Sequence, residues 1–126
     1  MKMRSGIGKC LSTLVAAGAV AFAAQAEGPD GEQLFKRQCA VCHSTQPGQV
    51  LVGPSLAGLL GRPAGDDKLF RYSPAMKSSG IVWDADTVGS FIESPRHMVP
   101  GTQMAYPGER NPEKRAAIVA YLSTLQ

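Results

Sequence analysis

The sequence predicts an all-α domain of about four to five short helices joined by long loops. Residues that favour helix starts recur along the chain, and no stretch alternates between apolar and polar residues as a half-buried strand does. Between residues 44 and 66 the chain carries five glycines and three prolines, which indicates an ordered loop rather than a regular element. The predicted helices are therefore few and lie mainly toward the two ends of the domain.

The first helix is expected to begin at Asp30. From there Leu34, Phe35, Cys39 and Cys42 recur at helical spacing, so the helix is predicted to present one apolar face that includes both cysteines.

Three further helix starts follow in the order Ser73-Pro74, Asp84 and Asn111-Pro112. Each combines a side chain that can cap a helix with a favourable first turn. The helix after Asp84 is expected to stop before Pro95, because the residue before a proline is driven away from helical geometry. The last helix has one apolar face, made of Ile118, Tyr121, Leu122 and Leu125.

Residues 1–26 resemble a secretory leader rather than part of the domain. Basic residues come first, an apolar run extends from Leu11 to Ala24, and Ala24-Gln25-Ala26 matches the small-residue pattern that signal peptidase cleaves. We therefore expect residues 1–26 to be a cleaved Sec signal peptide and residues 27–126 to be a single domain in an exported, oxidising compartment.

Cleavage would change both the charge and the cysteine count. The whole chain has 13 basic and 10 acidic residues, but Lys2, Arg4 and Lys9 belong to the leader, so the mature chain is balanced. The sequence thus gives no reason to expect a nucleic-acid partner. No second hydrophobic segment follows, so no stable membrane insertion is expected after cleavage. Cys10 also leaves, and only Cys39 and Cys42 remain.

Three kinds of site could use the segment Cys39-Ala40-Val41-Cys42-His43. A thioredoxin-like redox pair would need a βαβ unit, which this sequence does not offer. A zinc site could combine Cys39, Cys42, His43 and His97, but adjacent Cys42 and His43 can hardly point at one tetrahedral centre. The third possibility is covalent haem attachment, for which C-x-x-C-H is the signature.

A haem would also complete the core. At a helix end, residues three apart share a face, so the two sulfurs can reach the two vinyl groups of one porphyrin edge, and the imidazole of His43 can approach the iron. About 100 residues with few large aliphatic side chains form a thin core that usually needs an additional stabilising element, and a large, mostly apolar macrocycle would supply it.

Three methionines of the mature chain could be the second axial ligand: Met76, Met98 and Met104. Methionines usually fill gaps in a core, and this is the expected role of Met76 and Met98. Met104 lies in an irregular segment that is too polar for a core strand and is stiffened by Pro100 and Pro107. Its thioether is therefore the preferred ligand.

Five blocks in the order of a known family strengthen this interpretation: GEQLFKRQCAVCH, VGPSLAGLLGR, FRYSPAMKSSGIVW, FIESPRHMVPGTQMAY and AAIVAYL. From Gly31 to Leu125 the chain resembles the class I, mitochondrial-type c-type cytochromes and is close to the bacterial cytochromes c2. The resemblance implies the cytochrome c fold, built around one covalently bound haem c.

The resemblance also implies individual roles. His43 and Met104 match the two axial ligands, and the carbonyl of Pro54 matches the acceptor of the other imidazole proton. The donors that match the contacts to a buried haem propionate are Arg62, Tyr72 and Trp83. Thr102, two residues before Met104, is also expected to bind the cofactor. Four residues match the contact between the first and last helices: Gly31, Phe35, Tyr121 and Leu122.

Four positions depart from the family pattern. Phe91 stands where many relatives have a tyrosine, and Met76 where they often have an asparagine, so two polar groups near the haem are lost. Gln38 and Gln103 occupy positions that are lysines around the haem edge of the mitochondrial proteins. The basic docking face is therefore expected to be weak.

The predicted function is that of a soluble periplasmic electron carrier, not an enzyme, which cycles a His/Met-ligated haem between Fe(III) and Fe(II). Its expected partners are redox proteins such as a quinol-oxidising complex, a terminal oxidase, a reductase or a dehydrogenase, and it is expected to be a monomer. Two alternatives remain at this stage. The protein could be a dedicated subunit of a periplasmic dehydrogenase, or an open-site haem enzyme if Met104 did not bind.

Overall fold

Five helices joined by long irregular segments account for the described part of the chain. The computed structural model describes residues 28–126, so the predicted signal peptide and Cys10 lie outside the described residues. The helices are α1 (Gly31–Gln38), α2 (Pro74–Lys77), α3 (Ala85–Glu93), α4 (Pro95–Met98) and α5 (Pro112–Leu122).

The all-α prediction is confirmed. Within residues 28–126 the only strand-like pairing is an isolated bridge between Pro63 and Val82. In the same range, no helix combines the length and the apolar composition that crossing a membrane would require.

All four predicted helix starts are correct. The side chains of Asp30, Ser73, Asp84 and Asn111 each accept a hydrogen bond from the backbone N–H three residues later, at distances between 2.7 and 3.1 Å. These bonds satisfy amide groups that the first turn of a helix leaves without partners.

The first helix ends earlier than its apolar spacing suggests. Its last residue is Gln38, and the N–H groups of Cys39 and Ala40 both bond to the carbonyl of Phe35. The chain then makes one further turn, in which the N–H groups of Cys42 and His43 both bond to the carbonyl of Cys39, at 3.0 and 2.9 Å. Both cysteines and the histidine therefore still lie on one hydrogen-bonded turn of the chain.

Helix α4 was not predicted. The chain leaves α3 at Glu93, and a new four-residue helix begins at Pro95 directly after Ser94. Proline is disfavoured inside a helix but well suited to the first helical position, and Pro95 is buried. The same residue therefore ends one helix and starts the next.

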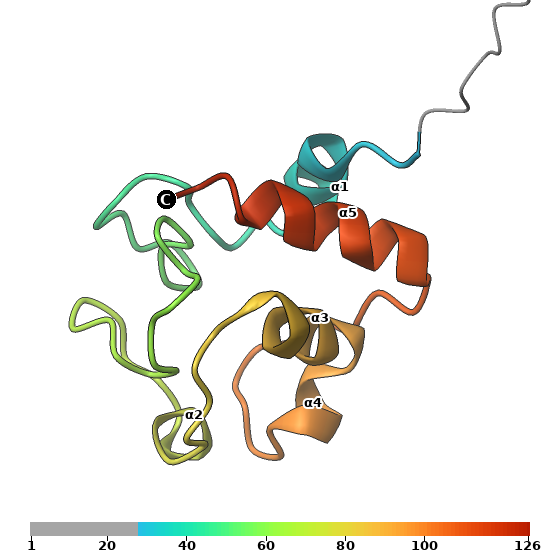
Figure 1. Cartoon of the computed structure of the whole chain (residues 1–126). Helices are drawn as coiled ribbons and strands as arrows, with labels where there is room; N and C mark the ends of the chain where they lie inside the picture. The colour runs from blue at the N-terminus through green and yellow to red at the C-terminus, as the bar shows by residue number, and fades with distance from the viewer. Residues whose placement is uncertain (1–27) are drawn as a thin grey trace, which may run out of the picture.

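Helices α1 and α5 pack against each other on one side of the molecule, with α3 below α5 and α4 next to α3 (Figure 1). The loop that follows α1 lies on the opposite side of the picture, beyond the end of α5. At the α1–α5 contact, the rings of Phe35 and Tyr121 lie 5.2 Å apart. Leu34 of α1 and Ile118 and Leu122 of α5 are also buried, as members of the same hydrophobic core.

The long loop after α1 is held by hydrogen bonds of its own. The buried Ser55 donates to the carbonyl of Gln46 at 2.6 Å, and the hydroxyl of Ser44 accepts from the N–H of Gln46 at 2.9 Å. Farther along, the N–H of Gly61 donates to the carbonyl of Trp83 at 2.7 Å. These bonds pair polar backbone groups that would otherwise be costly to bury, so the loop is ordered, as its composition predicts.

The close approach of α1 and α5 predicts that Gly31→Ala destabilises the protein. A Cβ at Gly31 would lie only 2.0 Å from the carbonyl oxygen of Ala117, so the two helix backbones must separate. We expect the free energy of unfolding, measured with urea, to fall by about 1–3 kcal/mol, as for other overpacked contacts.

Gly89→Ala in α3 is the matched control, because a Cβ there would meet nothing closer than 3.9 Å. It should leave stability unchanged or raise it by up to about 1 kcal/mol through better helix propensity. Equal effects of the two substitutions would contradict the tight crossing.

Candidate functional site

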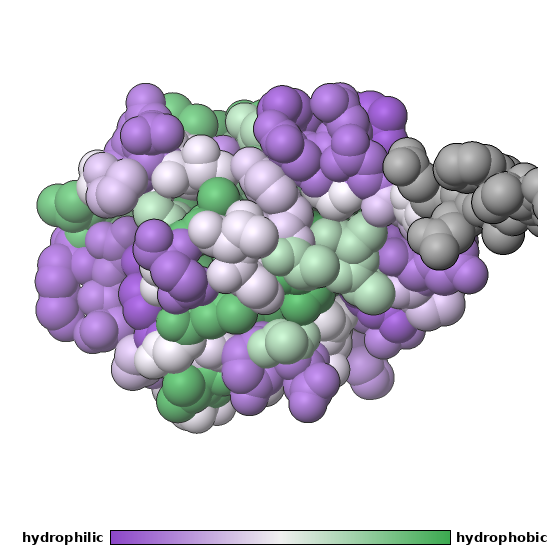
Figure 2. Space-filling view, turned by 45° about the horizontal axis from the view of Figure 1, so that its top comes forward, coloured by the Kyte–Doolittle hydropathy of each residue, from purple (hydrophilic) through white to green (hydrophobic). Residues whose placement is uncertain are grey.

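A cavity of about 460 Å³ lies inside the ring of helices and loops, and apolar side chains form most of its lining. In Figure 2, apolar side chains gather across the middle of one face and are bordered by hydrophilic ones. The nine residues that the sequence predicts for the site all line this one cavity: Cys39, Cys42, His43, Pro54, Arg62, Tyr72, Trp83, Thr102 and Met104.

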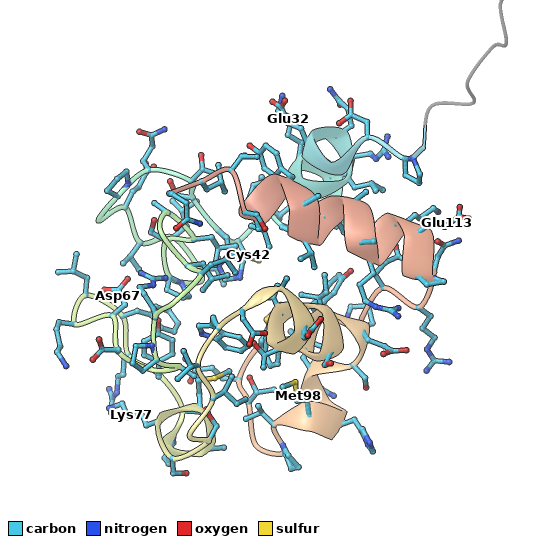
Figure 3. All side chains as sticks on the ribbon, viewed as in Figure 1. Glu32, Cys42, Asp67, Lys77, Met98 and Glu113 are labelled. Carbon is cyan, nitrogen blue, oxygen red and sulfur yellow. The ribbon has the colours of Figure 1, made fainter. Side chains whose placement is uncertain are left out.

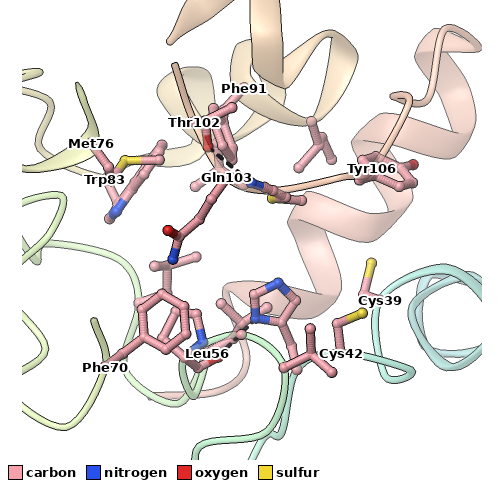
Figure 4. A pocket seen from close by; sticks show the side chains of 18 of the residues that line it. Cys39, Cys42, Leu56, Phe70, Met76, Trp83, Phe91, Thr102, Gln103 and Tyr106 are labelled. Atoms are coloured by element: carbon pink, nitrogen blue, oxygen red, sulfur yellow. Dashed lines mark hydrogen bonds between the residues drawn. The ribbon is translucent and has the colours of Figure 1, made fainter. Parts of the chain in front are cut away.

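The two cysteines share one wall of the cavity. Their sulfur atoms lie close together at one side of Figure 4, across from Thr102, Trp83 and Phe91. In Figure 3, Cys42 lies in the interior, whereas the labelled Glu32, Lys77 and Glu113 lie at the periphery. Both thiols are free and half-buried. Burial, reinforced by the neighbouring Cys42, raises the pKa of Cys39 to about 11.

His43 is fixed by its own backbone surroundings. Its Nδ1 lies 2.8 Å from the carbonyl oxygen of Pro54. A carbonyl can only accept, so Nδ1 carries the proton and Nε2 keeps its lone pair. Burial lowers the pKa of His43, against the opposing effect of the Pro54 bond. A lowered pKa favours the neutral imidazole, which is the form that binds a metal.

Gly53 is a functional position that the sequence analysis missed. A Cβ at this residue would lie 2.4 Å from Cε1 of His43, and its N–H donates to the carbonyl of Cys42 at 2.8 Å. The absence of a side chain leaves room for the imidazole ring. The only sequence signal was a glycine directly before Pro54, which a turn would explain equally well.

The three candidate methionines lie in different places. Met104 is half-buried and lines the cavity from the irregular segment between α4 and α5, where its N–H donates to the hydroxyl of Thr102 at 3.3 Å. Met76 also lines the cavity, but it is buried in the core as part of α2. Met98 lines a separate surface depression next to His97.

Three side chains that can donate hydrogen bonds line the cavity. They belong to the segment between α1 and α2 and to the segment just before α3. Arg62 is half-buried and donates to the carbonyl of Ser55 at 3.0 Å. Burial raises the pKa of Tyr72, and nearby Asp67 adds to the shift. Trp83 is 8% exposed, and its ring lies 5.2 Å from that of Phe91. A buried carboxylate needs such donors.

The four positions that depart from the family pattern lie at the same cavity. Phe91 and Met76 contribute apolar walls. Gln38 and Gln103 also line the cavity, and both side-chain amides are hydrogen-bonded. Gln103 donates to the carbonyl of Arg71 at 2.7 Å, and Gln38 bonds to Glu109 and Tyr106.

The two alternative uses of the cysteines find no support in the described part of the chain. A zinc site would need His97 beside the cysteines, but His97 is exposed and lines the other depression. No group of three or more His, Cys, Asp or Glu residues that could hold a metal ion occurs among residues 28–126. The thioredoxin-like alternative fails because the same range has no strand order for a βαβ unit.

The residues present fit a haem. The cavity wall is apolar, two thiols stand together on one side, and a neutral imidazole with a free Nε2 and a thioether can supply a nitrogen and a sulfur ligand. Haem iron in c-type cytochromes takes this pair of ligands. The donors of Arg62, Tyr72 and Trp83 suit the carboxylates of the macrocycle.

Comparisons with known proteins agree with this interpretation. The sequence pattern of the family described as "Cytochrome c" matches residues 29–126. Cytochrome c2 of Rhodopila globiformis is 47% identical over 97 residues, which cover 77% of this chain and 92% of the relative. Cytochrome c2 of Blastochloris viridis is 43% identical over 109 residues, or 86% and 85% of the two chains.

A solved structure gives the same result. Cytochrome cH from Methylobacterium extorquens superposes with a TM-score of 0.69 at 38% identity and covers 75% of this chain and 94% of that chain. The resemblance to class I c-type cytochromes close to the bacterial cytochromes c2 is therefore confirmed, and the chain belongs to the cytochrome c family.

Proposed function

We propose that this haem c electron carrier works in a bacterial periplasm, with His43 and Met104 as the two axial ligands of its iron. The observation that carries the proposal is the convergence of all nine predicted site residues on one cavity. The carrier function and the covalent haem c follow from the family, whereas the ligands, the compartment and the partners are proposals.

Bound haem c supplies one-electron exchange between Fe(III) and Fe(II). The chain attaches it through thioether bonds from Cys39 and Cys42 and gives it an apolar wall. His43 would hold the iron through Nε2, and the Pro54 carbonyl, by accepting the hydrogen bond from Nδ1–H, fixes the ring orientation and the ligand basicity.

Met104, on the segment between α4 and α5, would hold the iron through its thioether. A soft thioether favours Fe(II), and burial of the group disfavours the extra ferric charge, so both raise the reduction potential. With His43 and Met104 both bound, the group would serve electron exchange and would leave no open position for substrate chemistry. Thr102 accepts from the N–H of Met104 and thereby helps to orient this segment.

Arg62, Tyr72 and Trp83 are the proposed partners of a haem propionate. Their side chains line one cavity and offer a guanidinium, a phenol and an indole N–H. Together these donors replace the water that a carboxylate loses on burial.

The periplasmic location is supported by the leader pattern of residues 1–26, followed by a single domain from residue 27. We propose that the mature protein is a monomer that exchanges electrons with membrane or periplasmic partners such as a quinol-oxidising complex, a terminal oxidase, a reductase or a dehydrogenase.

The first prediction concerns attachment. In the variant with both Cys39→Ala and Cys42→Ala, haem should be lost on denaturing gels stained for haem. Circular dichroism should show a largely unfolded chain, because no other group would fill the apolar cavity. Cys10→Ala, within the predicted leader, is the control and should keep its haem. A compact, protease-resistant protein without haem would contradict the proposal.

The second prediction concerns Met104. The oxidised protein should show a weak near-infrared band from sulfur bound to iron, and Met104→Ala should abolish it. Met76→Leu and Met98→Leu are matched controls that should retain the band, since Met76 is core and Met98 lies outside the cavity. Loss of the band in Met98→Leu would instead assign the ligand to that residue.

The third prediction concerns partners. With a balanced mature charge, rates of association with membranes that contain a quinol-oxidising complex should fall only modestly with salt. Screening acts over about 10 Å at 0.1 M ionic strength. Gln103→Lys, at the exposed margin of the cavity, should make the fall steeper when the partner is acidic. A steep fall for the unmodified protein would mean that its basic residues gather at the haem edge.

A further inference from the structure

The segment that carries Met104 has no regular structure between α4 and α5. Such segments open more readily than helices because fewer of their backbone groups are paired internally. If Met104 binds iron, the loop must be held against the cavity by contacts outside itself. The part of the loop that follows Met104 is held by backbone contacts, whereas the stretch around Met104 is held by side chains.

The far end of the loop is fixed to α3. The N–H of Glu109 donates to the carbonyl of Ile92 at 2.8 Å, and Gly108, at a φ of 111°, lies against the end of this helix. A Cβ at Gly108 would lie 2.1 Å from the carbonyl oxygen of Glu93. These contacts lie after the methionine and leave the stretch around Met104 to be held by side chains.

Tyr106 provides such a contact, two residues after Met104. Its hydroxyl donates to Oε1 of Gln38 at 2.5 Å, and Nε2 of Gln38 donates to Oε2 of Glu109 at 3.0 Å. The other oxygen of Glu109 accepts from the N–H of Asn111 at 2.9 Å, where α5 begins. We call these three side chains, Tyr106, Gln38 and Glu109, the clasp.

The direction of each bond in the clasp follows from chemistry. An ionised carboxylate can only accept, so Glu109 requires the NH₂ group of Gln38. The carbonyl oxygen of Gln38 must then face Tyr106, which therefore donates. Each of the three groups has its complement, and the amide of Gln38 has one defined orientation.

The clasp joins the end of α1 to the methionine loop. Gln38 is the last residue of α1 and directly precedes Cys39, while Tyr106 belongs to the methionine loop. Figure 4 shows Tyr106 on the same side of the cavity as Cys39 and Cys42. Tyr106 and Gln38 are both half-buried, so water competes with their bond less than at an exposed site.

We infer that the clasp keeps the methionine loop closed, so that Tyr106 is a positioning residue that acts through Met104. This inference rests on the proposed His43/Met104 ligation. It gives Gln38 a role in holding the loop, in place of the docking charge that the family pattern would put there.

The test measures how easily added imidazole displaces Met104 from the ferric iron of the intact holoprotein. Imidazole can bind only when the loop opens, so its apparent affinity follows the open population. Titration is followed by loss of the sulfur-to-iron band. Tyr106→Phe removes only the hydroxyl, and Gln38→Met removes the amide while keeping the side-chain length.

Each variant should bind imidazole about three- to tenfold more tightly than the unmodified protein, which is the range that the loss of one hydrogen bond predicts. The double variant should bind no more tightly than the stronger single variant, because both substitutions break the same bond. Tyr121→Phe, at the α1–α5 contact, is the control and should stay within about twofold.

Unchanged affinity in Tyr106→Phe, or effects of the two substitutions that multiply in the double variant, would overturn the clasp while leaving the ligation intact. A protein that lacks the sulfur-to-iron band before any imidazole is added would overturn the ligation and the clasp together. A rise in affinity of equal size in Tyr121→Phe would show that general loosening, rather than the clasp, controls the loop.

Discussion

The constraint on which this structure depends is that its core is also the wall of its cofactor site. Among residues 28–126, eight of the eleven buried hydrophobic residues line the cavity: Leu59, Met76, Trp83, Val88, Phe91, Ile92, Ile118 and Leu122. The exceptions are Leu34 and Phe35, which belong to the α1–α5 contact, and Val99. Most of the apolar burial that stabilises the fold is thus completed by the bound group. The cofactor is a structural element as well as the redox centre.

Features encoded within a few residues could be predicted from the sequence. The four capped helix starts depend on one side chain and an N–H three residues away, as at Asp84 and Thr87. Helix α4 escaped prediction because Pro95 satisfies two local rules at once. Proline ends the preceding helix and is also favourable at the first position of the next one. The sequence analysis applied only the first rule, and the burial of Pro95 is a property of the tertiary structure that the sequence does not show.

The residues of the candidate site can likewise be divided into those that the sequence predicts and those that only the folded chain shows. The C-x-x-C-H motif assigns Cys39, Cys42 and His43 by spacing, the irregular segment that contains Met104 singled out this residue, and the resemblance to a family added the other five residues. The contact of Gly53 with the ring of His43 and the bond between Tyr106 and Gln38 could not be predicted. The latter joins residues 68 positions apart, and only the folded chain brings them together.

Helix α1 links the stability of the fold to the geometry of the site. Its first residue, Gly31, contacts α5 through the backbone of Ala117, and its last residue, Gln38, belongs to the clasp and adjoins Cys39. One eight-residue helix therefore carries the helix crossing at one end and adjoins the proposed cofactor attachment at the other. Because a helix is stiff along its axis, a shift of the crossing would move the attachment wall relative to the methionine loop. The close approach that glycine permits at position 31 thus fixes both the packing of the two terminal helices and the spacing between the two sides of the haem site.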